Sequence, residues 1–498
     1  MSDEKGIREA PTHITGILKE LGPGLIIAGS IVGSGELIAT TLTGAEAGFW
    51  LMWLILIGCV IKVFAQLEIG RYTITTGETA LEGLSKLPGV KPIGVHWTIW
   101  LWLIMFIAAL GQAGGIVGAV GQSISISVPI TEQGRAFNEA ADANVRNQIA
   151  QVIERTNGES TLETLALVEL PETGMDVFYW AFLMTVITCV ILYRGRYEMI
   201  ERFVLVMVGG FTVLSVVNIA LLQMNPVWAV SFSEIIDGLS FKLPPPKPGL
   251  DPIYTALATF GIIGMAAGEL IFYPYWCLEK GYARFVGPRS DRSSWADRAR
   301  GWMKVMHYDA FVSMVIYTIA TLAFFLMGVA VLHRNGLDPD GMRMVSTLSE
   351  QYVPVFGDYA KWLFLLGAVA VLYSTFMVAT AGHSRMFTDC FKIFGLMDEG
   401  NAAAHRRSVS IICVAVPLIA VGIFSTGANP VTLVFIGATM QALMLPLLGF
   451  AALYFRYKKT DPRIRPSVLW DVFLVISSLG LFVAGSWLAF DRLWKAFA

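Results

Sequence analysis

The stretch AGSIVGSGELIATT, residues 28–41, carries a glutamate inside an apolar run, and GIIGMAAGELIFYP, residues 261–274, repeats its tetrapeptide Gly-Glu-Leu-Ile. Each copy sets one carboxylate, Glu36 or Glu269, behind small residues that weaken a helix. A carboxylate at bilayer depth costs roughly 2.5 kcal/mol or more unless it faces a polar cavity. The duplication therefore predicts a two-fold repeat whose halves share one binding site.

The composition is that of a membrane protein with many spans. Apolar residues make up 55% of 498 residues and charged residues only 15%, whereas roughly 25% are charged in soluble proteins. Mean hydropathy is +0.62. Segments of about 20 apolar residues predict membrane-spanning helices. The eleven predicted spans lie near residues 23–43, 48–68, 97–121, 175–194, 203–222, 253–275, 308–332, 361–382, 408–425, 430–454 and 468–490.

The charged residues predict the orientation of these spans. Most of the 36 Lys and Arg residues fall in the segments that share a side with the N-terminus, which favours a cytoplasmic N-terminus and an external C-terminus. We expect a multi-pass protein of the cytoplasmic (inner) membrane. The basic loop 278–306 then lies inside, and the polar segment 122–174 lies outside. Apolar residues at Phe137, Ala141 and Val145 indicate an amphipathic helix in that outer segment.

The first ten spans divide into two halves of five. Because five is odd, the two halves cross the membrane in opposite orientations. The expected order is a tail (1–22), a first repeat (23–222), an outer linker (223–252), a second repeat (253–455) and a last span with the C-terminus (456–498). In inverted-repeat transporters, glycine-interrupted helices meet near the midplane, and their freed backbone groups bind the substrate. Such groups survive only where they line a cavity. The interrupting glycines here are Gly29, Gly33, Gly35, Gly261, Gly264 and Gly268.

These residues resemble the Nramp divalent-metal transporters, which have the LeuT-type fold. The family's binding motif Asp-Pro-Gly-Asn falls on Gly33-Ser34-Gly35-Glu36, and its Met-Pro-His-Asn falls on Ala266-Ala267-Gly268-Glu269. Further similarity lies at Leu21-Gly22-Pro23, Gln66, Arg71, Gly77 and Leu445-Pro446. The resemblance implies an all-α membrane protein of about eleven spans, with a 5+5 inverted repeat, broken helices 1 and 6, and one extra helix.

The departures from the family pattern rewrite the chemistry of the site. The family's metal-binding Asp is Gly33 here, and its Met ligand is Ala266. The sixth-span histidines fall on Gly268 and Tyr273, the third-span acids on Gln112 and Gly115, a tenth-span Gln on Ala438 with Gln441 one turn on, and an eighth-span Gln on His383.

The rewritten site favours a hard cation. Losing the thioether and gaining Glu36 and Glu269 suits Mg²⁺ or Mn²⁺ better than soft transition metals. Backbone carbonyls near Gly33 and Ala266 are further candidate ligands. Because the histidines and third-span acids are gone, we expect proton coupling that is weak, absent or rerouted.

Three further polar residues lie in or beside the predicted spans, and two of them have two interpretations. Lys62, several turns into the second span, either pairs with Glu36 or Glu269 or extends its ammonium to the cytoplasmic edge. His383 is either a pathway residue or a hydrogen-bonded packing histidine. The third of these residues, Asp309, opens the seventh predicted span and is interpreted as a helix N-terminal charge.

A different substrate class remains open. Gly33-Ser34-Gly35 also resembles the first-helix glycine motif of amino-acid carriers, whose backbone N–H groups hold a substrate carboxylate. Glu36 and Glu269 would then receive an ammonium, with Tyr273 as part of an aromatic wall or as an interface anchor. The sequence has no P-loop or other nucleotide-binding motif, so we expect no enzyme and no cofactor. The expected partners are the bilayer and the transported cation, amine or amino acid, with no nucleic acid and no required oligomer.

Overall fold

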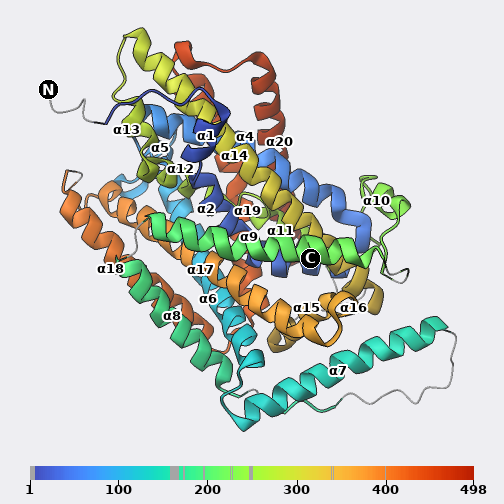
Figure 1. Ribbon diagram of the computed structural model, residues 1–498. Helices are drawn as coiled ribbons and strands as arrows, with labels where there is room; N and C mark the ends of the chain where they lie inside the picture. Colours follow the sequence, from blue (N-terminus) through green and yellow to red (C-terminus); the bar gives the residue numbers. More distant parts are fainter. Residues whose placement is uncertain are drawn as a thin grey trace.

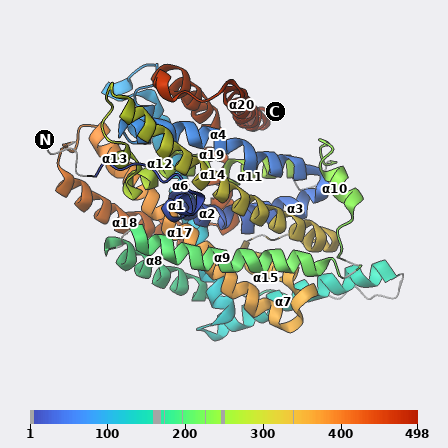
Figure 2. The same ribbon diagram turned by 45° about the horizontal axis from the view of Figure 1, so that its top comes forward.

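The described part of the protein is all-helical, which confirms the predicted fold class. The computed structural model describes residues 6–157, 168–171, 174–194, 197–224, 226, 228–245, 251–337, 339, 341–398 and 400–497, and no strand occurs among them. Long helices lie side by side in a bundle, and α7 (Glu132–Asn157) extends along one edge of it (Figures 1 and 2).

Nine segments of the described chain are long and apolar enough to cross a bilayer. The first, Pro23–Thr76, holds two predicted spans, because the chain turns at Gly48, whose φ is 62°. A further apolar helix ends at Leu222, so each of the eleven predicted spans coincides with helix. The helices of the spans are α2 (Pro23–Ile31), η1 (Ser34–Thr40), α3 (Thr41–Ala47), α4 (Met52–Thr76), α6 (Trp97–Ser127), α8 (Asp176–Arg194), α9 (Tyr197–Leu222), α11 (Pro252–Ile262), α12 (Ala267–Lys280), α14 (Ser293–Met327), η4 (Gly328–His333), α17 (Ala360–Ile393), α18 (Ala402–Phe424), α19 (Pro430–Tyr454) and α20 (Val468–Phe497).

Short helices connect or cover the spans. They are α1 (Ile14–Glu20), η2 (Gly48–Leu51), α5 (Ala80–Leu84), η3 (Pro92–Gly94), α10 (Phe232–Gly238), α13 (Tyr282–Val286), η5 (Gly341–Arg343), α15 (Met344–Ser349), η6 (Glu350–Tyr352), α16 (Val353–Phe356), η7 (Gly357–Tyr359), η8 (Phe455–Lys459) and η9 (Pro462–Ile464). The basic segment 278–306 is therefore mostly helix, because α12, α13 and α14 all reach into it. In the predicted outer linker 223–252, residues 225, 227 and 246–250 lie outside the described residues.

Both helices that carry the Gly-Glu-Leu-Ile copies are interrupted, as the glycines predict. Helix α2 ends at Ile31, and the chain resumes as the π-helix η1 after the extended Gly33. Helix α11 ends at Ile262, and α12 begins at Ala267. Between them Gly264 has φ 55°, and a Cβ there would lie 2.9 Å from the Cα atom of Cys59. Only glycine meets both demands without strain.

The bundle core forms around α6 and α19. Helix α6 packs against α19, α17, α8 and α18, while α4 packs against α14 and α2 against α14 and α17. Gly261 lets α11 approach α19 closely, because a Cβ there would lie 2.4 Å from the carbonyl oxygen of Ala438. The two interrupted helices thus lie inside the bundle, and every residue of the apolar window in α11–α12 is buried.

The amphipathic helix expected in segment 122–174 is confirmed as α7. Its Ala141 and Val145 are buried, and it packs against α15. Asp142 forms an ion pair with Lys361 at the start of α17. Helix α7 is therefore fastened to the bundle by apolar burial and by one ion pair among its described contacts.

Candidate cation site at the helix breaks

The break in α2 closes against α17. The hydroxyl of Ser374 donates to the carbonyl oxygen of Gly29 at 3.2 Å, and that of Thr375 donates to Ser30 O at 2.9 Å. A Cβ on Gly33 would lie 1.6 Å from the Thr375 hydroxyl oxygen, so glycine alone fits. Two of the carbonyls freed at the end of α2 are therefore satisfied by neutral hydroxyls.

The break in α11 closes differently. Lys62 is fully buried and donates from Nζ to the carbonyl oxygens of Phe260 and Ile263, the latter at 2.8 Å. Its hydrogen-bond partners among the described residues are these carbonyls, and no ion pair joins it to Glu36 or Glu269. Both sequence interpretations of this lysine were therefore wrong: it neither pairs with a glutamate nor reaches the membrane edge, because the end of a neighbouring helix offers it closer acceptors.

A small cavity of about 30 Å³ lies between the two breaks. Its walls come from α2, η1, α6, α11, α12, α17 and α19, with Ala266 lying just before α12. The polar residues that line it are Ser30, Ser34, Gln112, Glu269, Thr375, His383 and Gln441. Of the other predicted site residues, Gly35, Ala266 and Gly268 also line it.

Glu269 is the carboxylate of this cavity. It lies in the first turn of α12, where the unpaired N–H groups favour negative charge. Its Oε1 accepts a hydrogen bond from the Ser30 hydroxyl of α2 at 3.0 Å. One acidic side chain therefore connects the two interrupted helices.

Glu36 is placed elsewhere. It is fully buried on η1, and its Oε1 accepts from the Thr321 hydroxyl of α14 at 3.0 Å. Its Oε2 has no hydrogen-bond partner among the described residues. Glu36 does not line the cavity, although its neighbour Gly35 does. Glu36 and Glu269, which were expected to share one site, therefore do not both line it, because the helical turn at η1 directs Glu36 toward α14.

Amide side chains complete the opposite wall. Gln441 accepts from the backbone N–H of Gly268 at 2.9 Å, and its own amide donates to Gln112 Oε1 at 2.8 Å. His383 lies beside them in the cavity wall, and its ring packs edge-on against Phe106 with centroids 5.6 Å apart. Gln112 and Gln441 thus hold the start of α12 through neutral groups.

Tyr273 belongs to a contact outside the cavity. Its hydroxyl donates to Asp309 at 3.1 Å, and the same carboxylate accepts the N–H groups of Gly22 at 2.9 Å and Gly24 at 2.5 Å. The interpretation of Asp309 as an N-terminal charge of its own helix was wrong, because α14 begins at Ser293, four turns earlier. Asp309 caps the N-terminus of α2 instead, and Tyr273 supports it.

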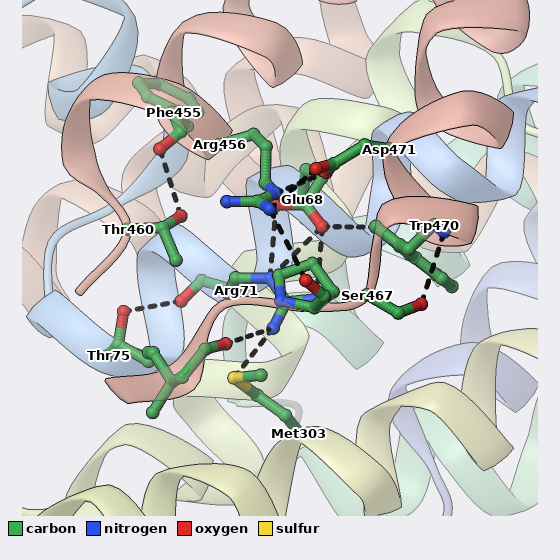
Figure 3. A network of polar contacts seen from close by, with 12 residues as sticks. Glu68, Arg71, Thr75, Met303, Phe455, Arg456, Thr460, Ser467, Trp470 and Asp471 are labelled. Atoms are coloured by element: carbon green, nitrogen blue, oxygen red, sulfur yellow. Dashed lines mark hydrogen bonds and ion pairs between the residues drawn. The ribbon is translucent and has the colours of Figure 1, made fainter. Parts of the chain in front are cut away.

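A second buried polar network ties α4 to the last span (Figure 3). Arg71 forms an ion pair with Glu68. It also donates to the carbonyl oxygen of Ile464. Trp470 donates from its indole nitrogen to Glu68 at 2.6 Å. None of these side chains lines the cavity. The network holds α4 against α20, because Glu68 lies on α4 and Trp470 on α20.

The sequence reasoning missed some of the cavity wall. Ser30 and Thr375 line the cavity and were not noted; Ser34 was noted only as part of a backbone motif, and Gln112 only as the replacement of an acid. Ser30 stands one turn before Gly33 in the opening stretch, and Ser374-Thr375 is a hydroxyl pair inside an apolar span. Hydroxyls facing a helix break were the signal that could have found them. Among the described residues, no group of three His, Cys, Asp or Glu side chains converges as a metal site.

Two interrupted helices that meet at a buried polar cavity within a helical bundle define a membrane transporter of the LeuT-type fold. The chain belongs to the Nramp family, since residues 164–491 match the model described as "natural resistance-associated macrophage protein-like". The matched residues include the second break and its Glu269, whereas the first break lies before them.

One relative agrees with this assignment, and solved structures agree with the fold. The chain is similar to the divalent metal cation transporter MntH of Caldanaerobacter subterraneus subsp. tengcongensis, with 22% identity over 438 residues, 86% of this chain and 84% of the relative. Its fold is similar to that of the Eremococcus coleocola manganese transporter in complex with an aromatic bis-isothiourea substituted compound, with a TM-score of 0.61, 16% identity, and 98% and 91% of the two chains covered. It is also similar to MhsT in complex with L-phenylalanine, with a TM-score of 0.53, 17% identity, and 96% and 99% covered.

Proposed function

We propose that this protein is a secondary transporter of divalent cations, with Mg²⁺ or Mn²⁺ favoured over soft transition metals. The observation that carries the proposal is the carboxylate of Glu269 in a small cavity between the two helix breaks. The two repeats would rock around this fixed point, exposing it to each side of the membrane in turn. We also propose a cytoplasmic N-terminus in the inner membrane, on the strength of the Lys and Arg bias.

The polar groups of the cavity wall support a hard cation. They are one carboxylate, three hydroxyls, two amides and one imidazole, and no sulfur atom is among the lining side chains. Oxygen donors suit Mg²⁺ and Mn²⁺, whereas thioether and thiolate groups select softer metals. Mg²⁺ typically keeps several waters and takes one or two carboxylates, so a single acid with neutral oxygens matches its needs.

The size of the cavity also favours an ion. Its volume of about 30 Å³ gives room for about two or three water molecules, counted at 10–15 Å³ each. A partly hydrated ion fits that space, but an amino acid would require the walls to move apart. The names of the relative and of one similar structure, a divalent metal cation transporter and a manganese transporter, point to the same class of substrate.

Glu36 has a secondary role in this proposal. Because it lies outside the cavity wall, we assign it a contribution through charge rather than through a direct metal bond. Gln112 falls where the Nramp family has an acid in the third span, and Gly268 falls where it has a histidine in the sixth span. Both of the replaced side chains could carry a proton. Proton coupling is therefore proposed to be weak, absent or rerouted through Glu269 or His383.

The competing substrate is an amino acid or organic amine. The fold similarity to MhsT bound to L-phenylalanine supports it, and Glu269 offers a partner for an ammonium group. In that case the backbone of Gly33-Ser34-Gly35 would hold the substrate carboxylate. The small cavity is the observation against it.

Flux measurements in proteoliposomes test the proposal. We expect Mg²⁺ or Mn²⁺ uptake that falls about tenfold or more in Glu269→Gln, because the variant loses the one charged group of the cavity. Glu36→Gln should reduce uptake less. Glu139→Gln, at an exposed position on α7, is the matched control and should behave as the wild type.

Two outcomes would contradict the proposal. One is unchanged divalent uptake in both Glu269→Gln and Glu36→Gln. The other is no divalent uptake at all, together with thermal stabilisation of the wild type by an amino acid or amine.

A further inference from the structure

The broken end of α11 holds a charged side chain from the chain itself. Lys62 reaches it from α4 and is fully buried. Its Nζ donates to the carbonyl oxygens of Phe260 and Ile263, with 2.8 Å to Ile263. The same nitrogen lies 4.7 Å from the centroid of the Phe260 ring. An amine nitrogen is thus surrounded by two carbonyl oxygens and an aromatic face.

These surroundings are the ones that bind a small cation. The last carbonyls of a helix lack intrahelical partners and form the negative end of its dipole. Carbonyl oxygens replace the hydration shell of monovalent ions in channels, and an aromatic face adds attraction. Within the described residues, no carboxylate forms an ion pair with Lys62, and the carbonyl end of the helix supplies its hydrogen-bond acceptors.

The corresponding end of α2 shows the contrast. There the freed carbonyls of Gly29 and Ser30 accept from the hydroxyls of Ser374 and Thr375, which carry no charge. The two breaks are related by the repeat, yet only one of them holds a cationic group among the described contacts. Simple capping of a helix end therefore does not require a lysine, and the charge at α11 calls for its own explanation.

We propose that the end of α11 is a monovalent-cation site that the chain fills with its own Lys62 ammonium. The protein then needs no Na⁺ or K⁺ from solution at this place. The charge also lies close to the transport cavity, because Ile262, which is adjacent to Ile263, lines it. The consequence for transport depends on the proposed function, whereas the cation site itself does not.

Removing the side chain should open the site to free cations. We expect purified Lys62→Ala in choline chloride to melt well below the wild type. In KCl, NaCl or methylammonium chloride of equal ionic strength, it should regain about 5 °C or more in at least one salt, because a ligand that binds only the folded state stabilises it by mass action. Choline is too large for the space left by one side chain. The wild type should melt at the same temperature in all four salts.

Two variants control the experiment. Lys62→Met fills the space without donors or charge, so it should be destabilised and insensitive to the choice of salt. Lys304→Ala removes an exposed lysine of α14 and should behave as the wild type. If folded Lys62→Ala can be purified only in the presence of KCl, dialysis into choline chloride should unfold it. Such unfolding would also show that the variant needs a small cation.

The proposal is overturned if Lys62→Ala responds equally to choline and to the small cations. It is also overturned if Lys62→Met keeps the wild-type melting temperature, because the carbonyl oxygens would then need no cation. In proteoliposomes, divalent uptake by Lys62→Ala should depend on Na⁺, K⁺ or methylammonium, whereas wild-type uptake should not. A wild type without divalent uptake would remove the proposed function, but the melting temperatures would still decide the cation site.

Discussion

At the scale of single residues, Gly33 decides how the first break closes. It lies against Thr375, whose hydroxyl both occupies the place of a Cβ and donates to Ser30 O. Ser30 in turn donates to Glu269. Because Gly33 has no side chain, Thr375 can bind Ser30, and Ser30 can bind Glu269. The orientation of the Glu269 carboxylate therefore depends on a glycine at position 33.

Gly33→Ala should consequently destabilise the protein by about 1–3 kcal/mol, the usual range for forcing atoms into a packed core. The Thr375 side chain would have to leave, and the carbonyl oxygen of Ser30 would lose its partner. Thermal unfolding of the detergent-purified variant measures the effect. Gly422→Ala, at a helical position with open space around it, is the control and should be neutral or slightly stabilising. Equal melting temperatures for the two variants would show that the α2 break tolerates a side chain.

At the scale of elements, Asp309 joins three helices. From α14 it accepts two N–H groups at the start of α2 and the hydroxyl of Tyr273 on α12. On α12, Glu279 forms an ion pair with Arg385 of α17. The helices that carry the two breaks are therefore held together at the end of the bundle where α2 begins. A transporter that alternates must loosen such contacts in one of its states.

Asp309→Asn should weaken this junction, because an amide removes the negative charge that the helix N-terminus favours. We expect a loss of about 1–3 kcal/mol, typical of a buried hydrogen-bonded charge. Tyr273→Phe removes one donor and should cost less. In a background without the five native cysteines, a cysteine at Ser34 should also react faster with a water-soluble reagent, since the cavity would open more often. Asp291→Asn, at an exposed position, serves as the control, and unchanged stability together with unchanged labelling in Asp309→Asn would argue against the junction.

At the scale of the whole molecule, α7 and the short helices α15 and η6 cover one end of the bundle. Asp142 on α7 pairs with Lys361, and Glu350 on η6 lies near both of them and Arg146. Burial, followed by the charge of Asp142, raises the pKa of Glu350 to about 7, although Arg146 and Lys361 act in the opposite direction. This cover therefore contains an acid that the fold holds in its neutral form below neutral pH.

The stability of the protein should depend on pH through Glu350. Because its folded pKa lies above its unfolded value, the folded state binds the extra proton, and stability falls as pH rises from about 4.5 to about 7. The difference amounts to at most about 3 kcal/mol, from 1.36 kcal/mol per pKa unit. Melting temperatures between pH 5 and pH 8 should fall less in Glu350→Gln than in the wild type. Parallel curves for the two proteins would show that Glu350 titrates normally.

Much of the architecture follows from the sequence because the bilayer restricts which backbone structures can cross it. A run of apolar residues that crosses lipid must satisfy its backbone internally, so each predicted span became helix. Glycines beside a buried acid predicted the two interruptions correctly. Glycine weakens a helix, and a carboxylate within the bilayer must face a polar cavity. The amphipathic spacing at Ala141 and Val145 likewise predicted α7.

The sequence by itself thus determined the spans and the breaks, through backbone hydrogen bonding and the weakening of a helix by glycine. Only the tertiary structure decided that Glu36 faces Thr321, that Lys62 caps α11, and that Asp309 caps α2. The physical reason is that a polar side chain in a bundle has several possible partners at similar cost. The rotation of each helix about its axis, set by the packing of its neighbours, selects which partner comes within hydrogen-bonding distance.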